Sequence, residues 1–246
     1  MKKLSAILLI VLAASLVLTA CSNKAEKITV ATDATFPPFE SVNDQTKDLE
    51  GFDIDLMKAI AEKAKMDIEF VNLPFDPMLT GVAGCQYDIA IAAISITPKR
   101  QEEMLFSDPY IISGQIVVVN KKNTTIKGLA DLKGLTVAAQ LGTTGEIEAK
   151  NIEGVNYKPY DTYDLAFLDL ANGQIDAVIA DNPTAVGFIA MNPEKIMTVG
   201  EVFNSEPYGI AVCNKKATLL EKVNKALKDV TTDGVIDQLA EKWLTQ

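Results

Sequence analysis

Short apolar runs alternate along the chain with longer segments whose apolar residues recur at a helical spacing. The runs at 28–31, 68–73 and 88–94 predict three strands. Residues 53–65 (DIDLMKAIAEKAK) lie between the first two runs, and their apolar positions predict an amphipathic helix. Strand–helix–strand order with continuous apolar strands is typical of a parallel sheet that is covered on both faces.

The same layout occurs a second time further along the chain. LTVAAQ at 135–140 resembles ITVATD at 28–33, and QIDAVIAD at 174–181 resembles QYDIAIAA at 86–93. A further amphipathic helix is expected between the members of the second pair, at about 162–172. The pattern therefore predicts an α/β protein with two lobes of similar construction.

Two extended segments are expected to connect the predicted lobes. GQIVVVNKK at 114–122 would pass from the first lobe to the second, and PYGIAVCNKK at 207–216 would return. Lobe 1 would then comprise residues 27–116 and 210–246, and lobe 2 would comprise residues 117–209. Two crossing strands form a hinge, because a few changes of backbone angle can swing rigid lobes.

The beginning of the chain has the features of an export signal. A basic start is followed by an apolar run at 4–18, which is too short for a typical membrane span, and by small residues before Cys21. The junction LTAC resembles the bacterial lipobox, so we expect a signal peptide at 1–20, a lipidated Cys21 and a polar tether at 21–27. The alternative is an ordinary signal peptide with a chance cysteine.

This reading predicts that the protein is exported. Two acyl chains on Cys21 would anchor it to the outer face of the cell membrane, or within the periplasm of a host with two membranes.

The composition excludes several kinds of function. The chain has 23 basic and 33 acidic side chains and a formal net charge of −10, which is poorly suited to nucleic acid. It has no histidine, so Ser–His–Asp and Cys–His catalysis and the usual zinc sites are excluded. We expect no metal and no cofactor. After Cys21, only Cys85 and Cys213 remain, and an exported chain can pair them or keep two free thiols.

Polar residues follow the predicted strands at their carboxyl ends, where ligands bind in open α/β sheets. Asp33 follows the first strand, and Ser95 and Arg100 follow the third. In the second lobe, one strand ends at Gln140 and another at Asp181. Two lobes that face each other would bring these four strand ends to one cleft.

Arg100 has the most informative position among these residues. Thr97 is expected to cap a helix and Pro98 to begin it, which puts Arg100 in the first turn. A guanidinium beside free backbone N–H groups would bind a carboxylate through both of its oxygens. The alternative is a solvated arginine paired with Glu103.

Asp181 is the candidate partner for an ammonium group. Asn182 is expected to cap the next helix because Pro183 follows it, which would leave Asp181 free. The alternative is that Asp181 itself caps the helix. The loop GTTG at 142–145 could present backbone N–H groups to an anion, although it lacks a phosphate-loop motif. Phe36 and Phe75 could equally be core aromatics.

Several longer motifs together resemble one family. They are ITVATDATFPPFE, LEGFDIDLMKAIAEKA, YDIAIAAISITPKRQEEMLFSDPY, LGTTG and IDAVIADNPTA, in that order between about residues 28 and 243. They are similar to those of the family 3 solute-binding proteins of ABC importers for polar amino acids. The resemblance implies the bilobal type II periplasmic-binding-protein fold and the capture of a free L-amino acid for the importer's permease subunits.

The resemblance also implies roles for individual residues. Arg100, Ser95 and the backbone N–H of Thr144 would hold the ligand carboxylate, while Asp181 and the Ala93 carbonyl would hold its ammonium. The ligand side chain would contact the following residues: Phe36, Phe75, Asp33, Gln140 and Gly145. The acid at Asp33 suits arginine or lysine, and with Gln140 beside it a glutamine side chain fits equally well.

The implied fold also bears on the two cysteines and on competing functions. In this fold the returning strand of lobe 1 runs antiparallel beside the third strand, which would bring Cys213 to Cys85 and predicts a disulfide. A monomer is expected. One alternative function is a cyclohexadienyl-type dehydratase on the same fold, which would have little use for an amino-acid clamp. A receptor-linked sensor module is the other.

Overall fold

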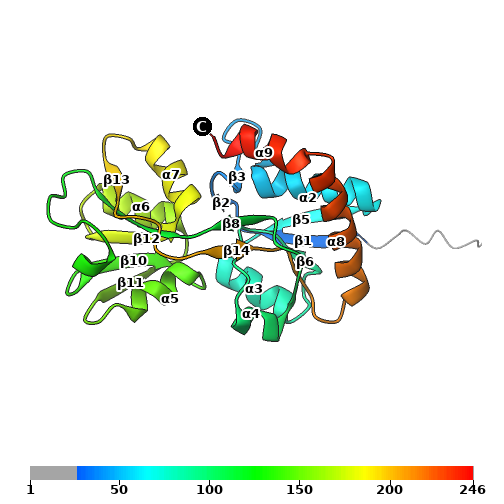
Figure 1. The fold of residues 1–246 in the computed structure, drawn as a ribbon, viewed down its shortest axis with the longest axis horizontal. Coiled ribbons are helices and arrows are strands. Elements are labelled where there is room, and N and C mark those ends of the chain that lie inside the picture. The colour runs from blue at the N-terminus through cyan, green and yellow to red at the C-terminus, as the bar shows by residue number, and fades with distance from the viewer. Residues whose placement is uncertain (1–26, 246) are drawn as a thin grey trace, which may run out of the picture.

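A computed structural model describes residues 27–245 of this protein as two α/β lobes that lie side by side (Figure 1). The predicted signal peptide, Cys21 and nearly all of the predicted tether lie outside the described residues. Within residues 27–245, no helix is both long and apolar enough to cross a membrane.

The first lobe is built on a five-stranded sheet with the order β5-β1-β6-β15-β7. Its strands are β1 (Ile28–Thr32), β5 (Ile68–Asn72), β6 (Ile89–Ala90), β7 (Leu105–Phe106) and β15 (Ala211–Val212). Its helices are α2 (Phe52–Ala64), α3 (Phe75–Ala83), α4 (Pro98–Glu103), α8 (Ala217–Thr232) and α9 (Val235–Trp243). Apolar residues of α2 and α8 pack against one face of the sheet and those of α3 against the other, so both faces are covered.

The second lobe is built on another five-stranded sheet with the order β11-β10-β12-β9-β13. Its strands are β9 (Gln115–Asn120), β10 (Thr136–Gln140), β11 (Asn156–Tyr160), β12 (Ala177–Asp181) and β13 (Ile196–Val199). Its helices are α5 (Thr144–Asn151), α6 (Tyr163–Ala171) and α7 (Asn182–Met191), with a 3₁₀ turn at Leu129–Leu132. Apolar residues of α6 and α7 cover one face and Ala149 of α5 the other.

The two sheets repeat one arrangement of strands. In the first, β1 pairs in parallel with β5 and β6, and β15 runs antiparallel to β6. In the second, β10 pairs in parallel with β11 and β12, and β9 runs antiparallel to β12. The doubled layout predicted from the repeated apolar pattern is therefore present in the fold.

Two paired strands run between the lobes, β8 (Ile111–Ser113) and β14 (Glu206–Tyr208) (Figure 1). The segment 114–122, which we expected to form the first crossing, mostly forms β9 inside the second sheet. Gln115 and Ile116 therefore pair with lobe 2 rather than with lobe 1. The lobe boundaries remain a proposal, and this pairing favours placing the first one at about Gly114.

One predicted strand is much shorter than expected. Residues 89–94 are buried as predicted, but only Ile89 and Ala90 form a strand. The backbone of Ala93 has a φ of 46°, a left-handed conformation that an extended strand cannot contain. The apolar run therefore bends at its end toward the space between the lobes.

A small sheet of β2 (Thr35–Phe36), β3 (Glu40–Val42) and β4 (Leu49–Glu50) leads into helix α2. Gly51 joins β4 to α2 with a φ of 130°, and a Cβ atom there would lie 2.2 Å from the carbonyl oxygen of Phe39. Only glycine fits this junction, which fixes where α2 begins and therefore where Asp53 in its first turn lies.

The cysteines lie where the predicted strand pairing would put them. Strand β15 runs antiparallel to β6, with Val212 opposite Ile89. Cys213 directly follows β15, and Cys85 precedes β6. The two are joined by a disulfide with their Cα atoms 5.0 Å apart.

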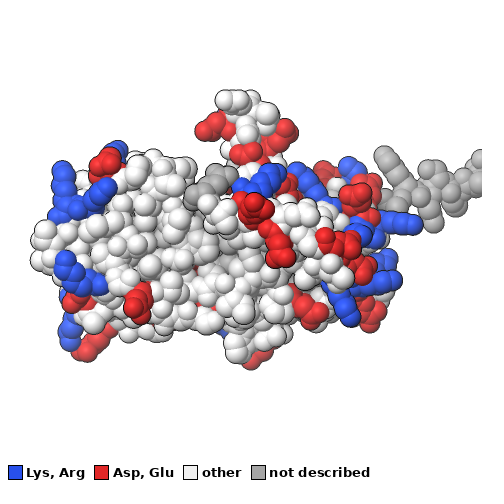
Figure 2. Space-filling model, turned by 45° about the horizontal axis from the view of Figure 1, so that its top comes forward, with Lys and Arg blue, Asp and Glu red and all other residues white. Residues whose placement is uncertain are grey.

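Charged side chains on the surface gather toward the ends of the molecule in the view of Figure 2, and the region between them is mostly neutral. Within residues 27–245 there is no group of three or more Cys, Asp or Glu side chains arranged to hold a metal ion.

Candidate functional site

A narrow cleft between the lobes brings most of the predicted ligand-binding residues together. The space left between their side chains is about 10 Å³. The cleft is lined by Phe36, Phe75, Ala92, Ala93, Ser95, Arg100, Thr143, Thr144 and Asp181. Asp33 and Gln140 bond to each other beside it. Ala92 and Thr143 were not predicted.

The guanidinium of Arg100 lies at the junction of the two lobes. The helix begins as predicted, because Thr97 caps α4 by accepting from the backbone N–H of Arg100. The side chain of Arg100 is 8 % exposed and donates to the carbonyl oxygen of Ser95 at 2.7 Å and to that of Gly142 at 2.9 Å. Burial lowers the pKa of Arg100 to about 10, so the group stays charged at neutral pH.

Asp181 occupies the N-cap position of α7, so the prediction that Asn182 caps this helix is wrong. Its side chain makes no capping hydrogen bond. It accepts instead from Gln115 at 2.9 Å and from the hydroxyl of Tyr208 at 2.6 Å. Burial, and next the charge of Glu206, raise the pKa of Asp181 to about 7. The carboxyl group therefore faces the cleft and is not used to cap the helix.

Asp33 and Gln140 connect the lobes at the other end of the cleft. Nε2 of Gln140 donates to Asp33 at 2.6 Å, and Thr35 donates to the second carboxylate oxygen at 2.8 Å. Asp33 is only 2 % exposed, and burial raises its pKa. Within residues 27–245, no lysine or arginine forms an ion pair with it.

Glu206 contacts two residues that line the cleft, and the sequence analysis missed it. It lies on β14, is 8 % exposed and accepts from the hydroxyls of Ser95 at 2.5 Å and Thr144 at 2.6 Å. It thereby links one hydroxyl from each lobe to the strand that runs between them. The sequence feature that could have indicated it is its position directly before the predicted returning strand at 207–216.

Gln115 and Tyr208 were also missed, and both bind the carboxylate of Asp181. Gln115 begins β9 and also donates to the hydroxyl of Thr144 at 3.1 Å. Tyr208 ends β14 and forms a β-bridge with Ser95. In the sequence, both residues belong to runs that predict strands, and nothing local distinguishes them from sheet residues.

Thr144 and Gly145 begin helix α5, which Thr143 caps by accepting from the backbone N–H of Glu146. Thr144 lines the cleft, but Gly145 does not. A Cβ atom on Gly145 would lie 2.6 Å from the hydroxyl of Tyr163, so this glycine allows close packing inside lobe 2. A direct role for Gly145 beside a ligand side chain has no support in this geometry.

Two aromatic rings flank the cleft. Phe75 begins α3, and the guanidinium carbon of Arg100 lies 5.4 Å from the centre of its ring. Phe36 in β2 packs against Tyr163 of the other lobe with ring centres 5.5 Å apart. Both rings are buried, 6 % and 5 % exposed, and both line the cleft.

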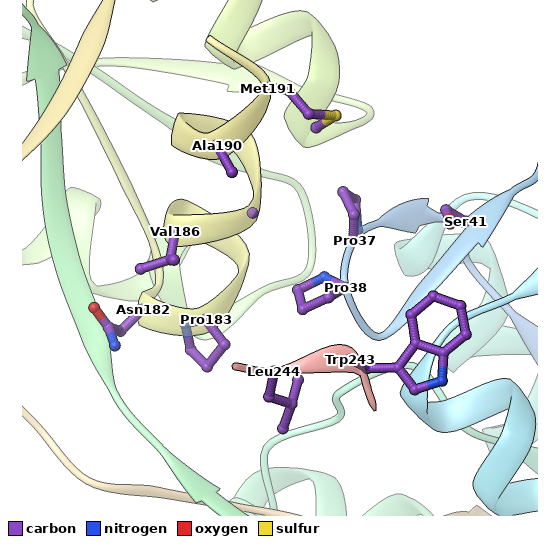
Figure 3. A pocket seen from close by; sticks show the side chains of 11 residues that line it. Pro37, Pro38, Ser41, Asn182, Pro183, Val186, Ala190, Met191, Trp243 and Leu244 are labelled. Atoms are coloured by element: carbon purple, nitrogen blue, oxygen red, sulfur yellow. The ribbon is translucent and has the colours of Figure 1, made fainter. Parts of the chain in front are cut away.

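A larger groove lies outside the cleft, with a volume of about 350 Å³. Helix α7 of lobe 2 forms one wall, and Pro37, Pro38 and the end of α9 form the other (Figure 3). No Asp, Glu, Lys or Arg side chain lines it, so it offers nothing to bind the two charges of an amino acid. The cleft between the lobes is the better candidate for the ligand site.

Comparison with known proteins agrees with the predicted fold and family. The family described as bacterial extracellular solute-binding proteins, family 3, matches residues 28–246. ABC transporter arginine-binding protein 1 of Escherichia coli K12 is 35 % identical over 231 residues, which cover 92 % of this chain and 93 % of that protein.

Solved structures of amino-acid-binding proteins are also similar to this chain. An ancestral arginine-binding protein bound to arginine is 44 % identical, with a TM-score of 0.84 over 88 % of this chain and 97 % of that one. An ancestral arginine-binding protein bound to glutamine is also 44 % identical, with a TM-score of 0.85 over 89 % and 98 %. These likenesses confirm the predicted bilobal type II periplasmic-binding-protein fold.

The relatives are substrate-binding proteins of amino acid ABC transporters, and this chain is likewise a binding protein rather than an enzyme. The dehydratase alternative is therefore wrong. The chain belongs to family 3 of the bacterial extracellular solute-binding proteins.

Proposed function

We propose that this protein captures a basic L-amino acid of the arginine or lysine class and delivers it to the permease subunits of an ABC importer. The observation that carries this choice is the buried carboxyl group of Asp33, which has hydrogen bonds but no cationic partner within the described residues. A buried carboxylate is costly unless it is paired, and a cationic ligand side chain would pair it.

The balance of charge in the cleft supports the same choice. Asp33, Asp181 and Glu206 contribute three buried carboxyl groups, against one guanidinium from Arg100. The carboxylate and ammonium groups of an amino acid add one charge of each sign and leave the imbalance unchanged. A positively charged ligand side chain reduces this excess of negative charge.

The backbone groups of the ligand would be held by side chains from both lobes. Arg100 and Ser95 of lobe 1 and the backbone N–H of Thr144 would bind the carboxylate. Asp181 of lobe 2 and the Ala93 carbonyl would bind the ammonium. Phe36 and Phe75 would enclose the side chain, and Gln140 would lie beside Asp33 at its polar end.

Binding would be coupled to closure of the lobes. A zwitterion satisfies Arg100 and Asp181 together only when the lobes approach each other. The ligand would take over existing contacts, such as those from Gln140 to Asp33 and from Arg100 to Gly142. It would therefore favour the closed form by its differential affinity, and the permease would recognise that form.

Glutamine is the second candidate ligand. The amide of Gln140 can exchange hydrogen bonds with a neutral amide side chain, and one structurally similar protein is described as bound to glutamine. Other similar proteins are named for arginine, histidine and cystine.

The discriminating experiment is a thermal-shift screen of the lipid-free protein against the common amino acids, followed by isothermal titration. A tight ligand raises the unfolding temperature in proportion to the logarithm of its concentration over Kd. Arginine or lysine should give the largest shift. A largest shift with glutamine would favour the second candidate, and no shift with any amino acid would overturn the proposal.

We further propose that the protein acts as a monomer anchored through a lipid on Cys21. The expected test is Cys21→Ser, which should release the protein from the membrane fraction. Retention of that variant in the membrane would argue against the anchor.

A further inference from the structure

Two carboxyl groups that the proposed ligand contacts do not use lie beneath the cleft. Glu40 begins strand β3, and Asp53 lies in the first turn of α2. Both residues are completely buried, at 0 % exposure. Buried carboxylates are costly unless they are paired or fully hydrogen-bonded, so these two require an explanation.

The hydrogen bonds of this pair are unevenly distributed. Oδ2 of Asp53 accepts from the backbone N–H of Ala93 at 2.7 Å and from the hydroxyl of Tyr110 at 2.8 Å. Oδ1 of Asp53 has no donor, and neither oxygen of Glu40 has one. The two carboxyl groups lie within hydrogen-bonding reach of each other.

A single proton would join the two carboxyl groups by a hydrogen bond. A carboxylate only accepts, whereas a protonated carboxyl group has one O–H that donates. If Glu40 carries the proton, its O–H finds an acceptor in the carboxylate of Asp53, one oxygen of which, Oδ1, is otherwise without a partner. We propose that Glu40 is a neutral carboxylic acid that donates to Asp53, and that this acid–carboxylate pair holds Ala93 in the conformation that the cleft requires.

The backbone of Ala93 explains what the pair would do. Its φ of 46° is a left-handed conformation that costs free energy in a residue other than glycine, and such conformations persist only when the surroundings hold them. The hydrogen bond to Asp53 is one such restraint. Ala93 lines the cleft, and under the proposed function its carbonyl binds the ligand ammonium. Asp53 and Glu40 would thus be positioning residues.

The strand of Glu40 also links it to the cleft. It lies opposite Phe36 in the antiparallel pair β2–β3, so the carboxyl pair and one wall of the cleft share the same small sheet. A change at Glu40 is therefore expected to reach the ligand without a direct contact.

The electrostatic surroundings agree with a neutral Glu40. Burial raises its pKa well above 4.5, and nearby acids raise it further. Burial also raises the pKa of Asp53, to about 7. The ionisable groups that act on the pair are Asp33 and Asp181, which act on Glu40, and Tyr110, which donates to Asp53 and itself lies near Tyr208.

The first test is independent of any ligand. Infrared difference spectra between the wild-type protein and Glu40→Gln, recorded on the whole exported protein at neutral pH, should show a protonated-carboxyl band that the wild type has and the variant lacks, besides the partial band of Asp181 that both proteins share. The matched control is Glu50→Gln in neighbouring β4, where the half-buried Glu50 accepts from Asn43. Loss of the same band in both variants, or its absence from the wild type, would overturn the proposal.

The pH dependence of unfolding gives a second ligand-independent readout. A raised pKa means that the folded protein binds more protons than the unfolded chain above pH 4.5, so stability falls as pH rises. The wild-type unfolding constant should rise by up to about tenfold per pH unit relative to Glu40→Gln. Parallel profiles for the two proteins would show that Glu40 ionises normally and would overturn the proposal.

The positioning role, which rests on the proposed function, is tested by binding of arginine. Glu40→Gln keeps a donor for Asp53 and should bind nearly as well as the wild type. Glu40→Leu leaves Oδ1 of Asp53 without a partner and should weaken binding about 5- to 150-fold. Equal affinities for Glu40→Leu and the wild type would overturn this role. If the wild type binds no amino acid, the proposed function fails, while the infrared and unfolding results still decide whether Glu40 holds the proton.

Discussion

Nε2 of Gln140 donates a hydrogen bond of 2.6 Å to the Oδ2 atom of Asp33 and joins the second lobe to the first beside the cleft. Gln140 ends β10 and Asp33 follows β1, so equivalent strands of the two sheets meet at this point. A cationic ligand side chain would take over this contact and meet a carboxylate that Thr35 also holds in place. The residue proposed to recognise the ligand side chain is therefore also one that joins the two lobes.

Asp33→Asn tests the choice of a basic ligand. The amide keeps the shape and the hydrogen bond from Thr35 but loses the charge. Binding of arginine or lysine should weaken by about 2–5 kcal/mol, the usual cost of truncating a buried charge pair. Glutamine should be affected much less, which isothermal titration with all three ligands would measure. Equal losses for arginine and glutamine would contradict the assignment.

Arg100→Lys tests the carboxylate clamp. Lysine keeps the charge but presents a single point donor instead of a planar fork, so it cannot bind both carboxylate oxygens in the same geometry. Affinity for any amino acid should fall by about 1.5–3 kcal/mol. Titration of two amino acids that differ in side chain should show the same loss, because the clamp would contact only the common carboxylate. Unchanged affinity would mean that Arg100 serves only to join the lobes.

The fold could be predicted because its main features are local and repeated. The apolar runs that begin at Ile28 and Leu135 indicate their strands directly, and the recurrence of the pattern predicts two equivalent sheets. The bend at Ala93 was missed because the hydrogen bond there, which the backbone N–H of Ala93 donates to Asp53, joins residues far apart in the sequence. Alternation of apolar residues contains no information about such a contact.

The candidate site was predictable only in part, for a similar reason. Arg100 follows a capping threonine and a proline, which the sequence displays. Glu206 and Gln115 reach the cleft-lining residues Thr144 and Asp181 only when the crossing strands and the second lobe pack together. Asp181 was expected before the helix cap and is the cap residue, because Pro183 occupies the second helical position rather than the first.

Asp181 should make ligand binding depend on pH. Its pKa of about 7 in the free protein means that part of the population is protonated at neutral pH, and an ammonium group binds the ionised form. Affinity should therefore rise with pH up to about 7 and level off above it, and Asp181→Asn should remove the dependence. Titration in buffers of different ionisation enthalpy should detect proton release. Affinity that is constant below pH 7 would contradict this role.

The raised pKa of Asp181 also makes the stability of the free protein depend on pH, in the opposite direction to ligand affinity. Because the pKa of Asp181 is raised from 3.8 to about 7, the folded state holds more protons than the unfolded chain between these values. Stability should fall as pH rises through this window. Asp181→Asn should flatten the profile measured by denaturant unfolding, and an unchanged slope would contradict the assignment.

The Cys85–Cys213 disulfide should stabilise lobe 1 without affecting the ligand. It links residues 128 positions apart and fastens β15 to the start of β6. Cys85→Ser with Cys213→Ser should lower the free energy of unfolding by about 2–5 kcal/mol in urea. Arginine affinity should remain close to that of the wild type, since neither cysteine lines the cleft. Addition of alkyl groups to the unreduced wild-type protein would show that the bridge is absent.

Gly187 of α7 lies against the other lobe outside the ligand cleft. A Cβ atom there would lie 3.0 Å from the carbonyl oxygen of Pro37 and 3.3 Å from Cδ of Pro38. These prolines face α7 across the groove of Figure 3. A larger side chain at Gly187 would therefore oppose this approach of the lobes.

Gly187→Leu should consequently weaken ligand binding without contacting the ligand. Overpacking of a close contact costs about 1–3 kcal/mol, which corresponds to about a 5- to 150-fold loss of affinity. The free protein should be as stable as the wild type or more stable, because leucine favours a helix by close to 1 kcal/mol over glycine. Val186→Leu is the comparison, since Val186 lines the same groove and is 43 % exposed, so added bulk there tests the groove apart from the contact of Gly187 with Pro37. Titration and thermal unfolding of both variants would separate the two effects, and an affinity loss shared by Val186→Leu would show that the contact at Gly187 does not limit closure.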